Sequence, residues 1–85
     1  MMPSAIILIN CEVGKEVEVA KALCEIQGTE RAYIVYGVYD IVVKLTAETM
    51  DGLEATVMKK VRSLPHVRTT ITLIVSRDCG AEEKL

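Results

Sequence analysis

The sequence contains no Phe and no Trp, and its only aromatic side chains are three Tyr. A core must therefore be built from Val, Ile, Leu, Ala and Met, and few aromatic rings remain on which nucleic acid bases could stack. Positive charge is also scarce, because ten Lys and Arg are outnumbered by twelve Asp and Glu, for a formal net charge of −2. Since phosphate binding requires clustered Lys and Arg, we expect no direct binding of nucleic acid.

Cysteine occurs only three times, at Cys11, Cys24 and Cys79, with no CxxC and no zinc-ligand spacing. An odd number is a poor basis for the disulfide framework of a secreted protein, so we expect a reducing, cytoplasmic setting. The apolar run over 5–9 is too short to span a membrane and has no basic leader before it. The sequence indicates no membrane association, no metal ion and no cofactor.

The most informative segment that is present, AYIVYGVYDIVVKL, covers residues 32–45. Two runs rich in Val, Ile and Tyr, which favour a pleated, half-buried surface, meet at a turn from Gly37 to Asp40. Gly37 provides backbone freedom, and Asp40 leaves one carboxylate at the exit of the turn. The pattern predicts a β-hairpin, with strands over 31–38 and 40–46 and a candidate ligand site at its tip.

The remaining segments alternate between strand and helix patterns. A nearly continuous apolar run predicts a central strand covered on both faces. Apolar side chains at helical spacing predict two helices, the first ended by Gly28 and the second capped by Thr49 and ended by Pro65. Cys11 and Cys24 fall on apolar faces and are expected in the core. The segments are a strand over 5–11, a helix over 15–27, a helix between Thr49 and Pro65, a strand over 67–76 and a polar tail over 77–85.

The element order β-α-β-β-α-β, in a single domain of residues 1–85, predicts an α+β, ferredoxin-like sandwich with both helices on one face of a four-stranded antiparallel sheet. The other face should then be polar in a monomer, but the first strand is apolar on both sides. The hairpin also places Tyr33 and Val35 on one face and Ile34 and Tyr36 on the other. Because an exposed apolar sheet is an association surface, we predict a homodimer packed sheet to sheet, a dimeric α+β barrel.

Three motifs in order resemble the effector-binding domain, or RAM domain, of the Lrp/AsnC transcriptional regulators: GVYDIVV over 37–43, LPHV over 64–67 and TIT over 70–72. Family members show a G-x-x-D hairpin followed by an apolar strand, a helix that ends in Leu-Pro-Gly-Val, and a last strand that opens with T-x-T. The resemblance covers nearly the whole chain and implies a stand-alone form without the helix-turn-helix. His66 stands where the family commonly has Gly, so we expect a different turn into the last strand.

The resemblance implies that dimers assemble further and that an amino acid or similar small effector binds near the interface between dimers. It also implies modulation of transcription, with a full-length Lrp/AsnC regulator as a candidate partner. Backbone amides near the glycine turn and Thr hydroxyls can donate to the effector's carboxylate, and Asp40 can pair with its ammonium. Tyr33 and Met50 are candidates for the pocket wall. The implied ligand-binding residues are Gly37, Val38, Tyr39 and Asp40 from the hairpin, with Thr70 and Thr72 from the last strand.

Plainer roles stay open for these residues. Asp40 could accept hydrogen bonds from backbone amides of its own turn, and Thr70 and Thr72 could be ordinary strand residues. The tyrosines could serve only as interface packing. His66, the only histidine, has no partner evident in the sequence, so we expect it at a surface turn and assign it no catalytic role.

Two alternative functions also stay open. Small enzymes of the dimeric α+β barrel type share this architecture, and fold does not determine function. No acid and base pair stands out in the sequence, so we expect no enzymatic activity and assign no catalytic residue. A purely structural assembly module that binds no ligand would have the same sequence pattern.

Overall fold

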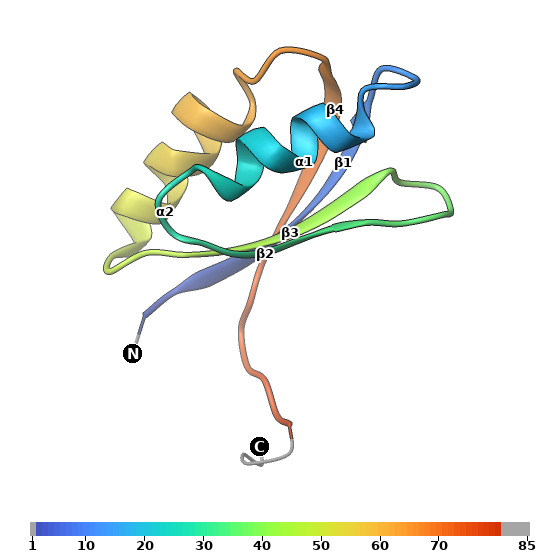
Figure 1. The fold of residues 1–85 in the computed structure, drawn as a ribbon. Coiled ribbons are helices and arrows are strands. Elements are labelled where there is room, and N and C mark those ends of the chain that lie inside the picture. The colour runs from blue at the N-terminus through green and yellow to red at the C-terminus, as the bar shows by residue number, and fades with distance from the viewer. Residues whose placement is uncertain (1, 81–85) are drawn as a thin grey trace.

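The computed structural model describes residues 2–80, and its elements follow the predicted order. The strands form one antiparallel sheet in the order β2-β3-β1-β4, and both helices lie on the same side of it (Figure 1). The predicted ferredoxin-like sandwich is confirmed. The elements are β1 (Ser4–Cys11), α1 (Glu16–Cys24), β2 (Thr29–Ile34), β3 (Ile41–Thr46), α2 (Met50–Thr56), its π-helical continuation η1 (Val57–Val61) and β4 (Val67–Ile74).

The core lies between the sheet and the two helices. Residues of β1 and β3 alternate between buried and half-buried, as expected when successive side chains point to opposite faces of a sheet. Direct cross-strand partners such as Ile7 and Val43 share the face that the helices cover. Within residues 2–80 the buried side chains are aliphatic except for one thiol, in line with the absence of Phe and Trp: Ala5, Ile7, Ile9, Cys11, Val19, Leu23, Ile41, Val43, Leu45, Leu53, Val57 and Val61.

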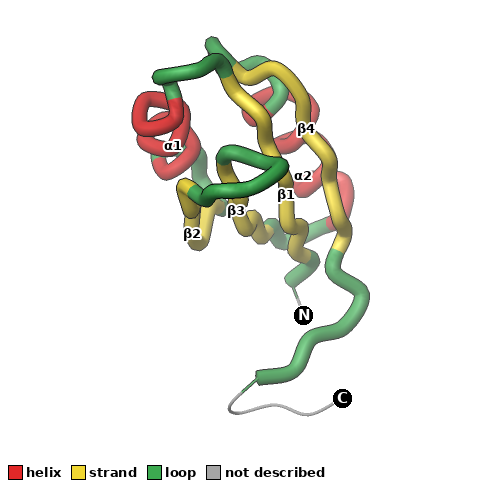
Figure 2. The backbone as a smooth tube through the Cα atoms, turned by 90° about the vertical axis from the view of Figure 1, so that its right-hand side faces the viewer, coloured by secondary structure: helices red, strands yellow, loops and turns green. Residues whose placement is uncertain are grey.

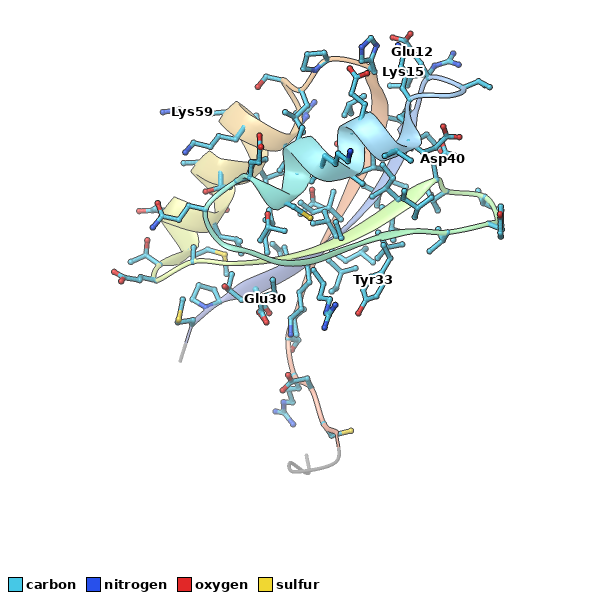
Figure 3. All side chains as sticks on the ribbon, viewed as in Figure 1. Glu12, Lys15, Glu30, Tyr33, Asp40 and Lys59 are labelled. Carbon is cyan, nitrogen blue, oxygen red and sulfur yellow. The ribbon has the colours of Figure 1, made fainter. Side chains whose placement is uncertain are left out.

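No element within residues 2–80 covers the other face of the sheet, from which Tyr33 projects away from the helices (Figures 1 and 3). The strand register aligns Tyr33, Val42, Leu8 and Ile71 in one row across all four strands. Exposure is 53% for Tyr33, 43% for Ile71 and 48% for Leu73. The apolar residues predicted on the second face are therefore confirmed, and Lys44 and Arg31 lie beside them in the row of Ile6 and Leu73. We call it the open face and define it by Ile6, Leu8, Tyr33, Val42, Ile71 and Leu73.

The hairpin between β2 and β3 is wider than predicted. β2 ends at Ile34 and not at 38, and residues 35–40 form a loop (Figure 2) that projects from the end of the sheet (Figure 1). The ladder closes where the Val35 N–H donates to the Asp40 carbonyl at 2.9 Å. The Asp40 N–H donates to the Ile9 carbonyl of β1 at 3.0 Å, so Asp40 is held by the central strand. The predicted turn from Gly37 to Asp40 is therefore part of a longer loop, and the predicted strand ends four residues early.

The first helix is shorter than predicted, and it ends at Cys24. Cys24 is exposed, so its predicted place in the core is wrong, whereas Cys11 is buried as predicted. Gly28 does not end the helix directly. It has φ +102° and leads into β2, with its carbonyl accepting the Thr46 N–H at 2.8 Å. The chain needs glycine there because a Cβ would lie 2.5 Å from the Thr46 carbonyl oxygen.

The second helix begins as predicted, because the Thr49 hydroxyl accepts the Gly52 N–H at 3.0 Å. Its last turn is π-helical, and the Arg62 N–H donates to the Val57 carbonyl at 3.1 Å. β4 ends at Ile74, two residues before the predicted end, and 75–80 form neither helix nor strand. The rest of the predicted polar tail lies outside the described residues. No helix within residues 2–80 is long and apolar enough to cross a membrane.

Candidate functional site

Asp40 lies at the end of the sheet where β3 begins, close to the start of α1 (Figure 3). Its Oδ2 accepts the backbone N–H of Cys11 at 2.9 Å. The bond therefore goes to another strand, and not to amides of its own turn as the plainer interpretation held. One of the two carboxylate oxygens is engaged in this way, so the side chain is held in place with acceptor capacity left on the other.

The end of the β1–β3 ladder explains why the Cys11 amide needs this acceptor. The last pair of that ladder is Ile9 with Ile41, so the Cys11 N–H, which points toward β3, has no strand carbonyl opposite it. A buried N–H without an acceptor is costly. The Asp40 carboxylate supplies that acceptor and fixes the end of β1. On the other side of β1, Asn10 pairs with Thr69 and Cys11 with Val67, so β4 contains a bulge with one extra residue, Arg68.

The Cys11 thiol beside Asp40 is a structural group. Burial raises the pKa of this thiol above its usual value, and the nearby carboxylates of Asp40 and Glu16 raise it further. Because the thiolate is the nucleophile and the thiol is not, the raised pKa lowers the reactive fraction of Cys11 at neutral pH. Within residues 2–80 no group of three or more His, Cys, Asp and Glu side chains is arranged to hold a metal ion.

Two shallow clefts meet at Asp40. One, of about 370 Å³, runs from the start of α1 to the loop after β2 and includes Glu16, Val17, Tyr36 and Gly37. The other, of about 350 Å³, lies across the ends of β1 and β4. We call the second one the bulge cleft and define it by Asn10, Cys11, Asp40, Arg68 and Thr69.

The structure brings only some of the predicted site residues together. Gly37 lies with Asp40 in the first cleft, and Val38 and Tyr39 belong to the same loop, with Val38 exposed and Tyr39 half-buried. Thr72 lines a separate, largely apolar cleft beside α2. Both clefts at Asp40 lack Thr72 and Thr70. A ligand held at Asp40 of one chain therefore does not reach these two hydroxyls through either cleft.

The strand register gives the reason. Thr70 and Thr72 pair with Ile9 and Ile7, whose side chains are buried under the helices, so both threonines point to the helix side of β4. Met50, a predicted wall residue, follows the far end of β3 and is separated from Asp40 by the length of that strand. Tyr33 belongs to the open face.

Sequence reasoning missed Asn10, Arg68 and Thr69, which line the bulge cleft with Asp40. Asn10 offered a signal, because it is a polar residue at the end of the apolar run that forms β1. Arg68 and Thr69 gave none, since their orientation depends on the bulge. A one-residue insertion in a strand changes the face to which each following side chain points.

His66 occupies a surface turn, as predicted, and the fold gives it two carboxylate partners that were not evident in the sequence. Its Nε2 lies 3.2 Å from a Glu18 carboxylate oxygen, and its Nδ1 lies 3.4 Å from one of Glu12. Its carbonyl accepts the Glu12 N–H at 2.9 Å. The residue has φ 73°, a left-handed conformation that favours the glycine found here in the family pattern.

We expect the His66→Gly protein to be more stable than the His66→Ala protein by about 1 kcal/mol, because glycine adopts a positive φ without the steric cost that alanine incurs. Both substitutions remove the contacts with Glu12 and Glu18, so their difference isolates the backbone conformation. Urea unfolding of the two variants at equal concentration measures it. Equal free energies of unfolding would contradict the assignment of strain to this position.

The comparisons with known proteins identify the family. The family model described as the Lrp/AsnC ligand binding domain matches residues 4–83. The chain belongs to this family. A stand-alone relative, FFRP-DM1, has a crystal structure with 36% sequence identity and a TM-score of 0.84, and the match covers 87% of this chain and 99% of that one. Hypothetical protein PHS023 from Pyrococcus horikoshii is 32% identical, with a TM-score of 0.84 and coverage of 98% and 100%.

The same fold forms about half of longer proteins. Transcriptional regulator NMB0573 from Neisseria meningitidis, whose structure is a complex with L-Met, has a TM-score of 0.80 and 14% identity. That match covers 92% of this chain and 52% of the regulator. At such identity the likeness shows the fold alone. A search of curated proteins finds no match.

Proposed function

We propose that this protein binds an amino acid or a similar small effector at Asp40, and that it does so as an assembled domain without catalysing a reaction. Membership of the Lrp/AsnC ligand-binding family supports the effector class. The observation that carries the proposal is the geometry of Asp40, a carboxylate fixed by the Cys11 amide at the meeting point of two clefts. Such an acceptor suits the ammonium group that every free amino acid carries.

The remaining predicted site residues fit this proposal in two groups. Gly37, Val38 and Tyr39 form the loop beside Asp40, so they can contact an effector within one chain. Thr70 and Thr72 face the helix side of β4, and they would contribute only from a neighbouring subunit. A site completed between subunits makes effector affinity and assembly reciprocal, because each stabilises the other.

Assembly through the open face is the second part of the proposal. The face carries six apolar side chains in register across four strands. Their exposure to water in an isolated domain is unfavourable, so the face favours association. A second copy, packed sheet to sheet, buries all of them at once. Dimers of this kind are proposed to assemble further.

The proposed setting follows from the family and the charge. The chain spans about half of the longer regulator NMB0573. We propose that it acts in the cytoplasm by co-assembly with a full-length Lrp/AsnC regulator that supplies the contacts with DNA. The net charge of −2 supports the view that this chain itself does not bind nucleic acid.

Asp40→Asn is expected to weaken amino acid binding by roughly 10- to 100-fold, the usual effect of losing one charged hydrogen bond. The asparagine oxygen can still accept the Cys11 N–H, so the end of β1 stays intact. Isothermal titration calorimetry with each of the twenty standard L-amino acids tests this.

The matched control is Asp51→Asn, which removes an exposed carboxylate in the first turn of α2 and should leave binding unchanged. The unmodified protein should bind at least one amino acid at millimolar concentration or below. Absence of binding by any of the twenty, or equal binding by the Asp40→Asn protein, would overturn the assignment.

A further inference from the structure

We propose that Arg68 binds the carboxylate of the effector and that the bulge cleft thereby selects ligands that carry both an ammonium and a carboxylate. This inference rests on the proposed function, and it names the ligand chemistry of that same site. It starts from the bulge in β4, where Arg68 is the extra residue between the Asn10–Thr69 pair and the Cys11–Val67 pair.

The bulge brings Arg68 and Thr69 to one cleft. In a regular strand, neighbouring residues point to opposite faces, so Arg68 and Thr69 would be separated by the sheet. A bulge places two residues opposite one and redirects a side chain. Accordingly, Arg68 and Thr69 line the same cleft, together with Asp40.

The two charges of the bulge cleft come from opposite sides of β1. The β1–β3 register that pairs Ile9 with Ile41 places Asp40 beside Asn10, and the β1–β4 register places Thr69 on the other side of Asn10. Strands two positions apart in a sheet lie about 10 Å from each other. Asp40 and Arg68 can therefore approach a small molecule in the bulge cleft from opposite sides of β1.

The charges of Asp40 and Arg68 are not neutralised within the described part of the chain, so both can pair with a ligand. Among the described residues Asp40 and Arg68 take part in no ion pair, with each other or with any other side chain. An Arg guanidinium is the side chain best matched to a carboxylate, because it can donate two parallel N–H bonds. The Asn10 amide and the Thr69 hydroxyl, between these charges, add neutral donors and acceptors.

The bulge cleft therefore has one carboxylate, from Asp40, and one guanidinium, from Arg68, with polar groups beside them. These charges are complementary to the ammonium and the carboxylate of a zwitterion. An amine without a carboxylate satisfies only Asp40, and a carboxylic acid without an amine satisfies only Arg68. The effector's own side chain is left to extend toward Tyr36 and Gly37 in the adjoining cleft, which shares Asp40.

The test uses the unmodified protein, Arg68→Gln, Arg68→Lys and, as a matched control, Arg62→Gln at an exposed position after η1. Each protein is titrated by calorimetry with the twenty standard L-amino acids and with the α-carboxamide of whichever amino acid binds tightest. For the unmodified protein, the carboxamide should bind about tenfold or more weakly than the acid, in line with loss of a charged hydrogen bond.

Arg68→Gln should weaken binding of the acid by a similar factor and leave binding of the carboxamide unchanged, and Arg68→Lys should restore part of the loss. Arg62→Gln should change neither. If Arg68→Gln leaves the acid's affinity intact, or weakens acid and carboxamide equally, the Arg68 assignment is overturned while the proposed function stands. If no amino acid binds the unmodified protein, both are overturned.

Discussion

The Leu73→Glu protein is expected to be a folded monomer at concentrations at which the unmodified protein is associated. Leu73 pairs with Ile6 across the open face, and 48% of its surface is exposed in a single chain. Sheet-to-sheet packing buries this position, and burying an unpaired carboxylate costs several kcal/mol. A penalty of about 4 kcal/mol lowers an association constant roughly a thousandfold. Sedimentation velocity over a range of concentrations measures the change.

Val13→Glu provides the matched control for this substitution. Val13 is 94% exposed in the turn between β1 and α1, away from the open face. The Val13→Glu substitution adds the same charge outside the open face, so it should leave association unchanged. Circular dichroism establishes that both variants keep their secondary structure. A Leu73→Glu protein that associates as strongly as the unmodified one would show that the open face is not the contact surface.

Gly28→Ala is expected to destabilise the domain by about 3 kcal/mol or more, a large part of the 5–15 kcal/mol by which small domains are stable. Two causes combine. The φ of +102° is unfavourable for alanine, and the added Cβ would lie 2.5 Å from the Thr46 carbonyl oxygen. Because that oxygen belongs to the backbone of β3, the clash moves the Thr46–Gly28 hydrogen bond as well. Urea unfolding at fixed protein concentration measures the loss.

Gly14→Ala separates the two causes. Gly14 also has a positive φ, of 84°, but nothing lies within 4 Å of the position of an added Cβ. We expect this variant to lose only about 1 kcal/mol, the cost of the backbone conformation alone. Equal losses for the two variants would contradict the role assigned to the contact between Gly28 and Thr46.

The sequence was sufficient to predict the order of elements because local signals agreed with the fold. β-Branched runs marked the strands, and the Thr49 hydroxyl caps α2 as its position indicated. Apolar residues on both sides of β1 also predicted the uncovered face. These features depend on neighbours in sequence or on simple alternation, which a pattern records directly.

The candidate site was harder to predict from the sequence, because it depends on contacts between segments that are distant in the chain. Asp40 was identified, but its bond to the Cys11 amide joins residues 29 apart. The bulge at Arg68 decides which of the β4 side chains share a cleft with Asp40, and no local signal marks it. The same holds for His66, whose glutamate contacts come from the segments around α1.

The bulge cleft and the open face belong to the same sheet. Asp40 and Arg68 stand at one end of the sheet whose open face we propose as the subunit contact. An effector bound to both Asp40 and Arg68 would connect β3 to β4 and so also hold in place the strands that form that face. Effector binding and assembly are then expected to strengthen each other by the same free energy.

The central claim is that the open face is covered by a second copy of the chain, and sedimentation equilibrium of the unmodified protein tests it most directly. We expect the mass of a dimer or a multiple of it across the micromolar range, with no added partner. A single species with the mass of one chain over that whole range would contradict it.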